Sequence, residues 1–282
     1  MATASLDAPA RPALRRRASS GSTLTAGSAL GLGVAVTWFS LLVLIPLSAV
    51  VVTASERGWS GYIDTITGAQ TMAAIKLTVG QSLLVTLLNV VMGTLIAWVL
   101  VRDRFWGKRI LDVVIDIPFA LPTIVAGLVL LGLYGANSPL GLDWAYTPKA
   151  VFLALAFVTL PFVVRTVQPV LEELEHDVEE AAASLGASRL TIFRRIILPS
   201  LTPAITAGAA LAFARAIAEY GSLVLLSGNK PFDTEVASVR MLSFIENGST
   251  ASAAAVASLL LAVALFVILV LDVVQRRVSR HA

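Results

Sequence analysis

The chain has 282 residues, of which 57% are hydrophobic and only 14% are charged, and its formal net charge is +3. With a mean hydropathy of +0.84, this composition excludes an ordinary soluble enzyme, because soluble domains carry about 25% charged residues, and it excludes a disordered chain. The chain has no cysteine, so disulfides, thiolate metal sites and cysteine nucleophiles are excluded as well.

Six apolar segments, each long enough to cross a bilayer, follow one another along the chain. A hydrocarbon core about 30 Å thick needs about 20 helical residues. Backbone polar groups in lipid must be satisfied within a segment, so we expect helices. The predicted fold class is an all-α membrane protein with six transmembrane helices. These helices are predicted at residues 30–54, 77–101, 113–135, 150–171, 201–228 and 253–271, the third of them interrupted by Asp116, Pro118 and Pro122.

The segments divide the chain into four regions. Residues 1–28 are rich in Ala, Ser, Pro and Arg, and we expect a disordered cytoplasmic tail there. Residues 29–76 hold the first membrane helix and an outer loop, residues 77–274 the membrane core, and residues 275–282 a second cytoplasmic tail. The alternative that the first helix is a cleaved signal peptide is disfavoured, because its apolar run of about 25 residues exceeds the 7–15 of a signal sequence.

Basic residues are unequally divided between the two sides of the predicted membrane. Five lie on one side: Arg57, Lys76, Lys149, Lys230 and Arg240. Fourteen lie on the other: Arg11, Arg15, Arg16, Arg17, Arg102, Arg104, Lys108, Arg109, Arg189, Arg194, Arg195, Arg276, Arg277 and Arg280. The positive-inside rule therefore predicts that both termini are cytoplasmic.

The loop of residues 172–200, which separates the fourth and fifth helices, shows two helix signals. Asp177 and Glu180 have capping-box spacing, which predicts a short helix over residues 178–185. Gly186 would end that helix in a left-handed conformation, and Ser188 would cap a second helix reaching residue 197. The sequence thus predicts two short helices that meet at a glycine on the membrane surface.

The same loop resembles the EAA loop of ABC-importer permeases. The resemblance rests on the sequence EAA at residues 180–182, on Gly186, and on the later I-x-L-P run, each at the family's spacing. In that family the loop is the coupling helix, which docks on the ATPase subunit. The resemblance therefore implies an ATPase-coupling role for Glu179, Glu180, Ala181, Ala182, Gly186, Ile196, Leu198 and Pro199.

Two further stretches are similar to one branch of that family. Residues 116–123, DIPFALPT, and 161–173, PFVVRTVQPVLEE, resemble the T-type permease of the sulfate/thiosulfate importer. The resemblance implies a type I importer fold and half of a translocation pathway in the bacterial inner membrane. It also implies a W-type permease partner, two ATPase subunits and an extracytoplasmic sulfate-binding protein, with membrane lipid around the chain and no nucleic acid.

The resemblance also implies that this chain is not itself an enzyme and carries no cofactor. It has no G-x-x-x-x-G-K-[ST] phosphate loop, so ATP and Mg would bind the partner ATPase. Two alternatives stay open. One keeps the mechanism and changes the cargo to molybdate or tungstate. The other is an ATP-independent secondary anion transporter, which predicts two related halves that the sequence does not show.

Four charged residues fall within predicted helices and are candidates for the translocation path, because intramembrane charges are rare. Arg215 and Glu219 are four residues apart and share a helix face, so they form either an internal ion pair or an anion-facing arginine tuned by a carboxylate. Arg165 and Asp116 lie at similar depth and are predicted to pair between helices. The alternative for Arg165 is a snorkelling arginine.

Small and aromatic residues give weaker indications. Gly127, Gly132 and Gly208 are predicted to be helix-packing positions. The outer loops carry Trp59, Tyr62, Trp144 and Tyr146, which fit interfacial anchors or a docking surface for a binding protein.

Overall fold

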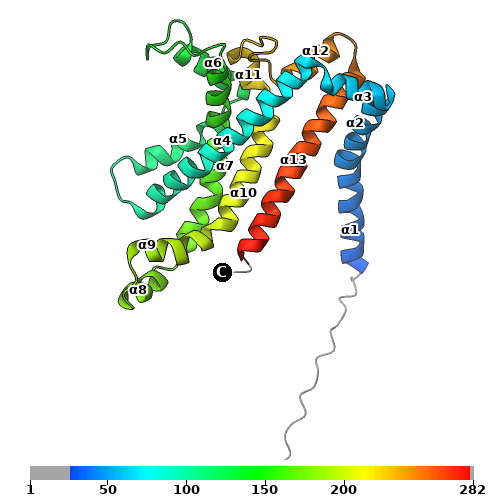
Figure 1. Ribbon diagram of the computed structural model, residues 1–282. Helices are drawn as coiled ribbons and strands as arrows, with labels where there is room; N and C mark the ends of the chain where they lie inside the picture. Colours follow the sequence, from blue (N-terminus) through cyan, green and yellow to red (C-terminus); the bar gives the residue numbers. More distant parts are fainter. Residues whose placement is uncertain (1–25, 280–282) are drawn as a thin grey trace, which may run out of the picture. The chain divides into compact units, whose positions relative to one another are not determined.

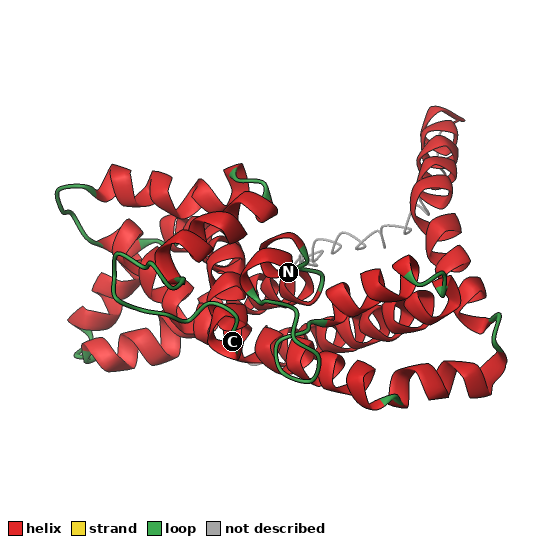
Figure 2. Ribbon diagram, turned by 90° about the horizontal axis from the view of Figure 1, so that it is seen from above, coloured by secondary structure: helices red, strands yellow, loops and turns green. Residues whose placement is uncertain are grey.

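The computed structural model describes residues 26–279, and throughout this range every regular element is a helix (Figures 1 and 2). Most of the predicted N-terminal tail, and residues 280–282 of the C-terminal one, lie outside the described residues. Five helices are long and apolar enough to cross a membrane, or six if one bent helix pair counts as a single span. The predicted all-α membrane fold is therefore confirmed.

The chain divides into two units, residues 1–48 and 49–282. The first unit contains α1 (Ala26–Phe39), a π-helical turn (Ser40–Leu44) and the start of α2 (Ile45–Ser55), which together supply the first candidate span. In the π turn the N–H of Ile45 donates to the carbonyl of Ser40, five residues back, and Pro46 follows directly. A proline lacks an N–H and crowds the carbonyl four residues before it, which favours such a widened turn.

The second unit is built around α4, α7, α10 and α13. Helix α4 packs on α7 and α10, α10 packs on α7 and α13, and the short α11 packs on α6 (Figure 1). The bounds of the first helices in this unit are α3 (Gly58–Thr67), α4 (Ala69–Arg102), α5 (Lys108–Ala120), α6 (Thr123–Tyr134) and α7 (Pro148–Glu173). The rest are α8 (His176–Ser184), α9 (Arg189–Ile192), α10 (Leu198–Ile217), α11 (Gly221–Leu226), α12 (Ala237–Glu246) and α13 (Thr250–Ser279).

The third predicted span, over 113–135, is broken at Pro122, one of the residues predicted to interrupt it, and its first part begins earlier, at Lys108. The chain bends by 117° between α5 and α6 (Figure 1). Leu121 has an extended backbone, with ψ 134°, because the following Pro122 disfavours a helical conformation for the residue before it. Pro122 also has no N–H to continue the hydrogen-bond ladder, so α6 begins anew at Thr123.

The fifth predicted helix, over 201–228, is also interrupted. Helix α10 ends at Ile217, and α11 begins only at Gly221. The carboxylate of Glu219 accepts hydrogen bonds from the N–H and the hydroxyl of Ser222, at 2.9 and 2.8 Å, and so satisfies a free donor in the first turn of α11. The hydroxyl of Ser238 donates to the Glu219 carbonyl at 2.7 Å. These side chains stabilise the break by replacing helical hydrogen bonds.

Glycines allow the closest helix contacts. A Cβ on Gly127 would lie 2.5 Å from the Ser222 carbonyl oxygen, and one on Gly208 would lie 3.0 Å from the Cα of Val163. The packing prediction is therefore confirmed for Gly127 and Gly208. It is wrong for Gly132, where a Cβ would meet nothing within 4 Å.

Candidate functional site: the 172–200 loop and the intramembrane charges

The 172–200 loop turns at Gly186. This glycine has φ +85°, its N–H donates to the Ala183 carbonyl at 2.9 Å, and the N–H of Ala187 donates to the Ala182 carbonyl at 3.0 Å. Those two bonds form a Schellman motif, in which a left-handed residue closes a helix and satisfies its last carbonyls. The predicted left-handed glycine is confirmed, and it directs the chain from α8 into α9.

The two helix starts in the loop differ in their caps. Ser188 accepts a hydrogen bond from the N–H of Thr191 at 3.2 Å, so the predicted cap of the second helix is confirmed. The predicted cap at Asp177 is wrong, because α8 starts earlier, at His176, with Glu175 at its N-cap and no side-chain cap bond. Asp177 and Glu179 instead lie in the first turn, where negative charge favours the positive end of the helix dipole.

The loop enters the membrane without a break. A π-helical turn, Phe193–Ile197, connects α9 to α10, and the N–H of Leu198 donates to the Phe193 carbonyl. Pro199 follows one residue later, the same arrangement as at Pro46. Residues 189–217 therefore form one continuous helical path from the loop into the membrane segment. Ile196 packs against the hydrophobic cluster at this end of the bundle.

One face of α8 is held against the membrane bundle. Glu179 forms an ion pair with Arg102, the last residue of α4, and their side chains are only 20% and 10% exposed. Ala182 packs against the same hydrophobic cluster as Ile196. Sequence reasoning did not find Arg102 as the partner, since the two residues are 77 positions apart.

Other side chains of the loop are exposed. The Leu185 side chain is 90% exposed, Leu190 and Val178 are exposed, and so are Glu180 and Ala181. An exposed apolar patch framed by charged residues on a polar loop is typical of a protein–protein interface. The predicted coupling residues thus separate into Glu179, Ala182 and Ile196, which anchor the loop, and an exposed set that includes Glu180 and Ala181.

Arg165 on α7 lies at the centre of a charge cluster with α5. Its Nε and Nη2 donate to the two carboxylate oxygens of Asp116, both at 2.7 Å, which gives the predicted pair a bidentate geometry. Nη1 donates to the carboxylate of Asp112 at 2.7 Å and to Gln168 at 2.6 Å, and Nη2 also donates to the Asp112 carbonyl. All five guanidinium N–H groups are therefore engaged. Asp112 is the member that the sequence analysis missed, although it lies one helical turn before Asp116.

Arg215 and Glu219 form an ion pair at the end of α10, as their spacing predicts. The Glu219 side chain is 1% exposed, whereas that of Arg215 is 30% exposed. Leu211, one turn before Arg215 on α10, is exposed, and so is Ala218, which follows the end of the helix. Glu219 is the only partner of Arg215 within the described residues, so most of the donors of this guanidinium are available to another group.

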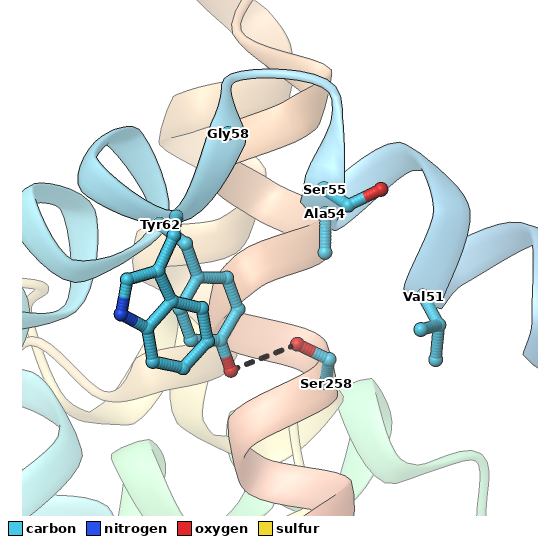
Figure 3. A pocket seen from close by; sticks show the side chains of 7 residues that line it. Val51, Ala54, Ser55, Gly58, Tyr62 and Ser258 are labelled. Atoms are coloured by element: carbon cyan, nitrogen blue, oxygen red, sulfur yellow. Dashed lines mark hydrogen bonds between the residues drawn. The ribbon is translucent and has the colours of Figure 1, made fainter.

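An apolar cavity of about 280 Å³ lies apart from both groups, at the junction of α2, α3 and α13 (Figure 3). The hydroxyls of Tyr62 and Ser258 are 3.3 Å apart across it, and the rings of Trp59 and Tyr62 are stacked with centroids 5.6 Å apart. Trp59 is largely exposed, and its role as an interfacial anchor stays a prediction. No group of three or more potential metal ligands occurs within the described part of the chain.

Comparison with known proteins agrees with these features. Residues 89–280 match the family "Binding-protein-dependent transport system inner membrane component". The chain is 41% identical over 262 residues to the sulfate transport system permease protein CysT of Salmonella typhimurium, covering 90% of this chain and 95% of the relative. It is also 41% identical over 256 residues to the protein of that name from Synechocystis, covering 88% and 90%.

Solved structures show the same fold. A chain of a bacterial ABC transporter involved in alginate import superposes with a TM-score of 0.74 at 17% identity, covering 89% of this chain and 95% of that one. A second structure, of the bacterial alginate ABC transporter in complex with an alginate-pentasaccharide-bound periplasmic protein, gives 0.72 at 19% identity, covering 89% and 94%. The predicted ABC-importer permease fold is therefore confirmed.

Proposed function

The chain belongs to the family of inner-membrane components of binding-protein-dependent transport systems, and we propose that within it this chain is a permease subunit of an ATP-driven sulfate/thiosulfate importer. The proposal of sulfate as the transported anion rests on the 41% identity, over 90% of the chain, to a protein named as a sulfate permease. The subunit would form one half of the translocation path and take part in ATP-driven closure through the 172–200 loop.

The proposed importer has four further subunits. A W-type permease supplies the other half of the path, two ATPase subunits bind ATP and Mg, and an extracytoplasmic sulfate-binding protein delivers the anion. The absence of a phosphate-loop motif from all 282 residues supports a separate ATPase. Two exposed leucines, Leu185 and Leu190, and the exposed Glu180 support the loop as the ATPase docking site.

We place the chain in the plasma membrane of a bacterium, with the 172–200 loop and both termini in the cytoplasm. The excess of basic residues on that side supports this orientation. The contact between Arg102 and Glu179 also supports it, because it puts the end of α4 on the same side as the loop, as the charge count requires.

Of the two intramembrane arginines, Arg215 is the better candidate for the anion path. A dianion in a low-dielectric core needs donors that replace its hydration. Arg215 is part-exposed and is held only by Glu219 within the described residues, so it has donors to offer. Arg165 has no free hydrogen-bond donor, and it pairs with two carboxylates whose combined charge exceeds its own. We therefore assign Arg165 and Asp116 to the support of α5.

The test is ATP-dependent uptake of radiolabelled sulfate into liposomes that contain this chain with the four partner subunits. Uptake that requires ATP and binding protein and resists equimolar molybdate would support the proposal. Uptake of molybdate in preference to sulfate would move the cargo to the molybdate alternative. Sulfate uptake that follows an ion gradient and ignores ATP would overturn the importer proposal in favour of a secondary transporter.

A further inference from the structure

Helix α4 is the longest helix of the second unit, and it contacts loops at both of its ends. Its 34 residues span about 51 Å at 1.5 Å per residue. It contains no proline, whereas α10 contains Pro203 and stops at Ile217, and α5 and α6 are bent by 117°. Helix α4 therefore connects the two sides of the membrane as one unbroken element.

At its cytoplasmic end α4 holds the 172–200 loop at two points. Arg102 pairs with Glu179 on α8. The Arg102 guanidinium also lies over the ring of Trp98, 5.5 Å from its centroid, and that ring meets Phe193 of the π turn edge-on at 5.8 Å. Because the ion pair is mostly shielded from solvent, each charge depends strongly on the other.

At its other end α4 holds the segment that joins α11 to α12. The N–H of Ala237 donates to the Thr78 hydroxyl at 2.8 Å, and the amide of Gln70 donates to the Glu235 carboxylate at 2.7 Å. Glu235 is buried. Three residues before it, Phe232 is 66% exposed and has φ +65°, a strained backbone conformation of the kind that recurs at functional loops.

We propose that Arg102 is a positioning residue that fixes the docking helix α8 to α4, so that displacement of α8 by the ATPase is carried along α4 to the outer segment 228–236. The inference rests on the proposed function, which supplies the ATPase on one side and the binding protein on the other. It adds a second connection to the covalent one through α10. Loss of the ion pair would leave docking intact, since the exposed face with Leu185 is unchanged, but it would weaken the link between nucleotide state and the outer loop.

The experiment uses the complete reconstituted complex, with partner subunits freed of cysteine, and exploits the absence of native cysteine from this subunit. Phe232→Cys in this subunit takes a fluorescent label at the outer loop. We expect ATP to change the label signal in the parent complex, and Arg102→Gln or Glu179→Gln to reduce both this change and the stimulation of ATPase activity by loaded binding protein about ten-fold, within the range of measured couplings. The double variant Arg102→Glu/Glu179→Arg is expected to recover most of both readouts.

The control is Asp272→Asn, which removes an exposed ion pair with Arg276 on α13 and is expected to leave both readouts unchanged. A purely structural role for Arg102 would lower both readouts only in proportion to lost assembly in the single variants, and that result would overturn the inference. Normal coupling in both single variants would overturn it as well. A parent complex that assembles, hydrolyses ATP and signals to the label, yet transports no sulfate, would overturn the proposed cargo and leave the role of Arg102 standing.

Discussion

Arg165 on α7 and Asp116 on α5 are joined by two parallel hydrogen bonds of 2.7 Å, and Asp112 shares the same guanidinium. Replacing Arg165 by Met would leave two carboxylates without their cation. We expect the free energy of unfolding of the assembled complex to fall by about 1–3 kcal/mol, below the cost of a fully buried pair because the acids are half-exposed. The stability of Arg165→Lys should lie between those of the parent and Arg165→Met, since an ammonium group keeps the charge but lacks the planar, bidentate donors of a guanidinium. Thermal unfolding measures this, with Arg276→Met as the exposed control, and equal melting of all variants would contradict it.

The contact between α6 and α11 predicts opposite effects at two glycines of the same helix. Gly127→Ala would place a methyl group 2.5 Å from the Ser222 carbonyl oxygen, and we expect a loss of about 1–3 kcal/mol from overpacking. Gly132→Ala meets nothing within 4 Å and should be neutral or stabilising by about 0.5–1 kcal/mol, because alanine favours helix. Thermal unfolding of the two variants in parallel tests the close contact between α6 and α11. A Gly127→Ala variant more stable than Gly132→Ala would contradict this prediction.

The activity of variants at position 186 should follow how well each side chain tolerates a left-handed backbone and not its size, because a Cβ there has open space. We expect ATP-driven uptake to decrease in the order Gly, Asn, Ala, Val, with a conformational cost of about 1–2 kcal/mol for alanine. Gly248 has φ +73° and equally open surroundings, so Gly248→Ala is a matched control for the strain alone. Equal loss of uptake in both alanine variants would show strain without a special role for the 172–200 loop.

Leu185 is predicted to contribute to ATPase binding and not to the fold. Its side chain is 90% exposed, so Leu185→Glu should leave the thermal stability of the permease pair unchanged while it reduces co-purification of the ATPase. Leu140→Glu, an exposed leucine in a different loop, is the control and should retain the ATPase. Full retention by both variants would remove the apolar patch from the docking interface.

Arg215 is predicted to act on transport rate. A hydrogen bond to a charged group is worth about 1.5–3 kcal/mol, so Arg215→Gln should lower the maximal rate of sulfate uptake about ten-fold or more. Arg215→Lys should retain part of it. Uptake should be expressed per assembled complex, because Arg215→Gln leaves the buried Glu219 carboxylate with its bonds to Ser222 but without its cation, which costs stability. Parent rates in Arg215→Gln would remove it from the path.

The sequence located the membrane helices because a span needs a long apolar run, and it located Gly186 because a helix that ends in a polar loop favours a left-handed glycine. It marked Pro122 as an interruption without the size of the bend, and it did not find the break at Glu219. Both lie inside apolar stretches that are long enough to span, so composition alone predicts a continuous helix. The signal was nonetheless present at Pro122, since a residue before proline avoids the helical conformation.

Partners that lie far apart in the sequence were recovered only in part. Depth along the helices indicated Arg165 with Asp116, whereas Asp112 could be added only once α5 was seen to present both carboxylates to α7. The pairing of Glu179 with Arg102 depends on how α8 folds back on the end of α4. That angle is set by the Gly186 turn and by packing, neither of which a single sequence measures.

The π turn before Pro199 changes the helical phase of everything upstream of it. Ile192 and Ile197 are both buried although they are five residues apart, a spacing that would separate them by about 140° around a regular α-helix. The extra residue in the widened turn brings both isoleucines to the same side. Removing one residue from Phe193–Ile197 would rotate the docking helices about the axis of α10 and aim Leu185 in another direction. In the proposed importer, the orientation of α8 toward the ATPase would therefore depend on one extra residue in a single helical turn.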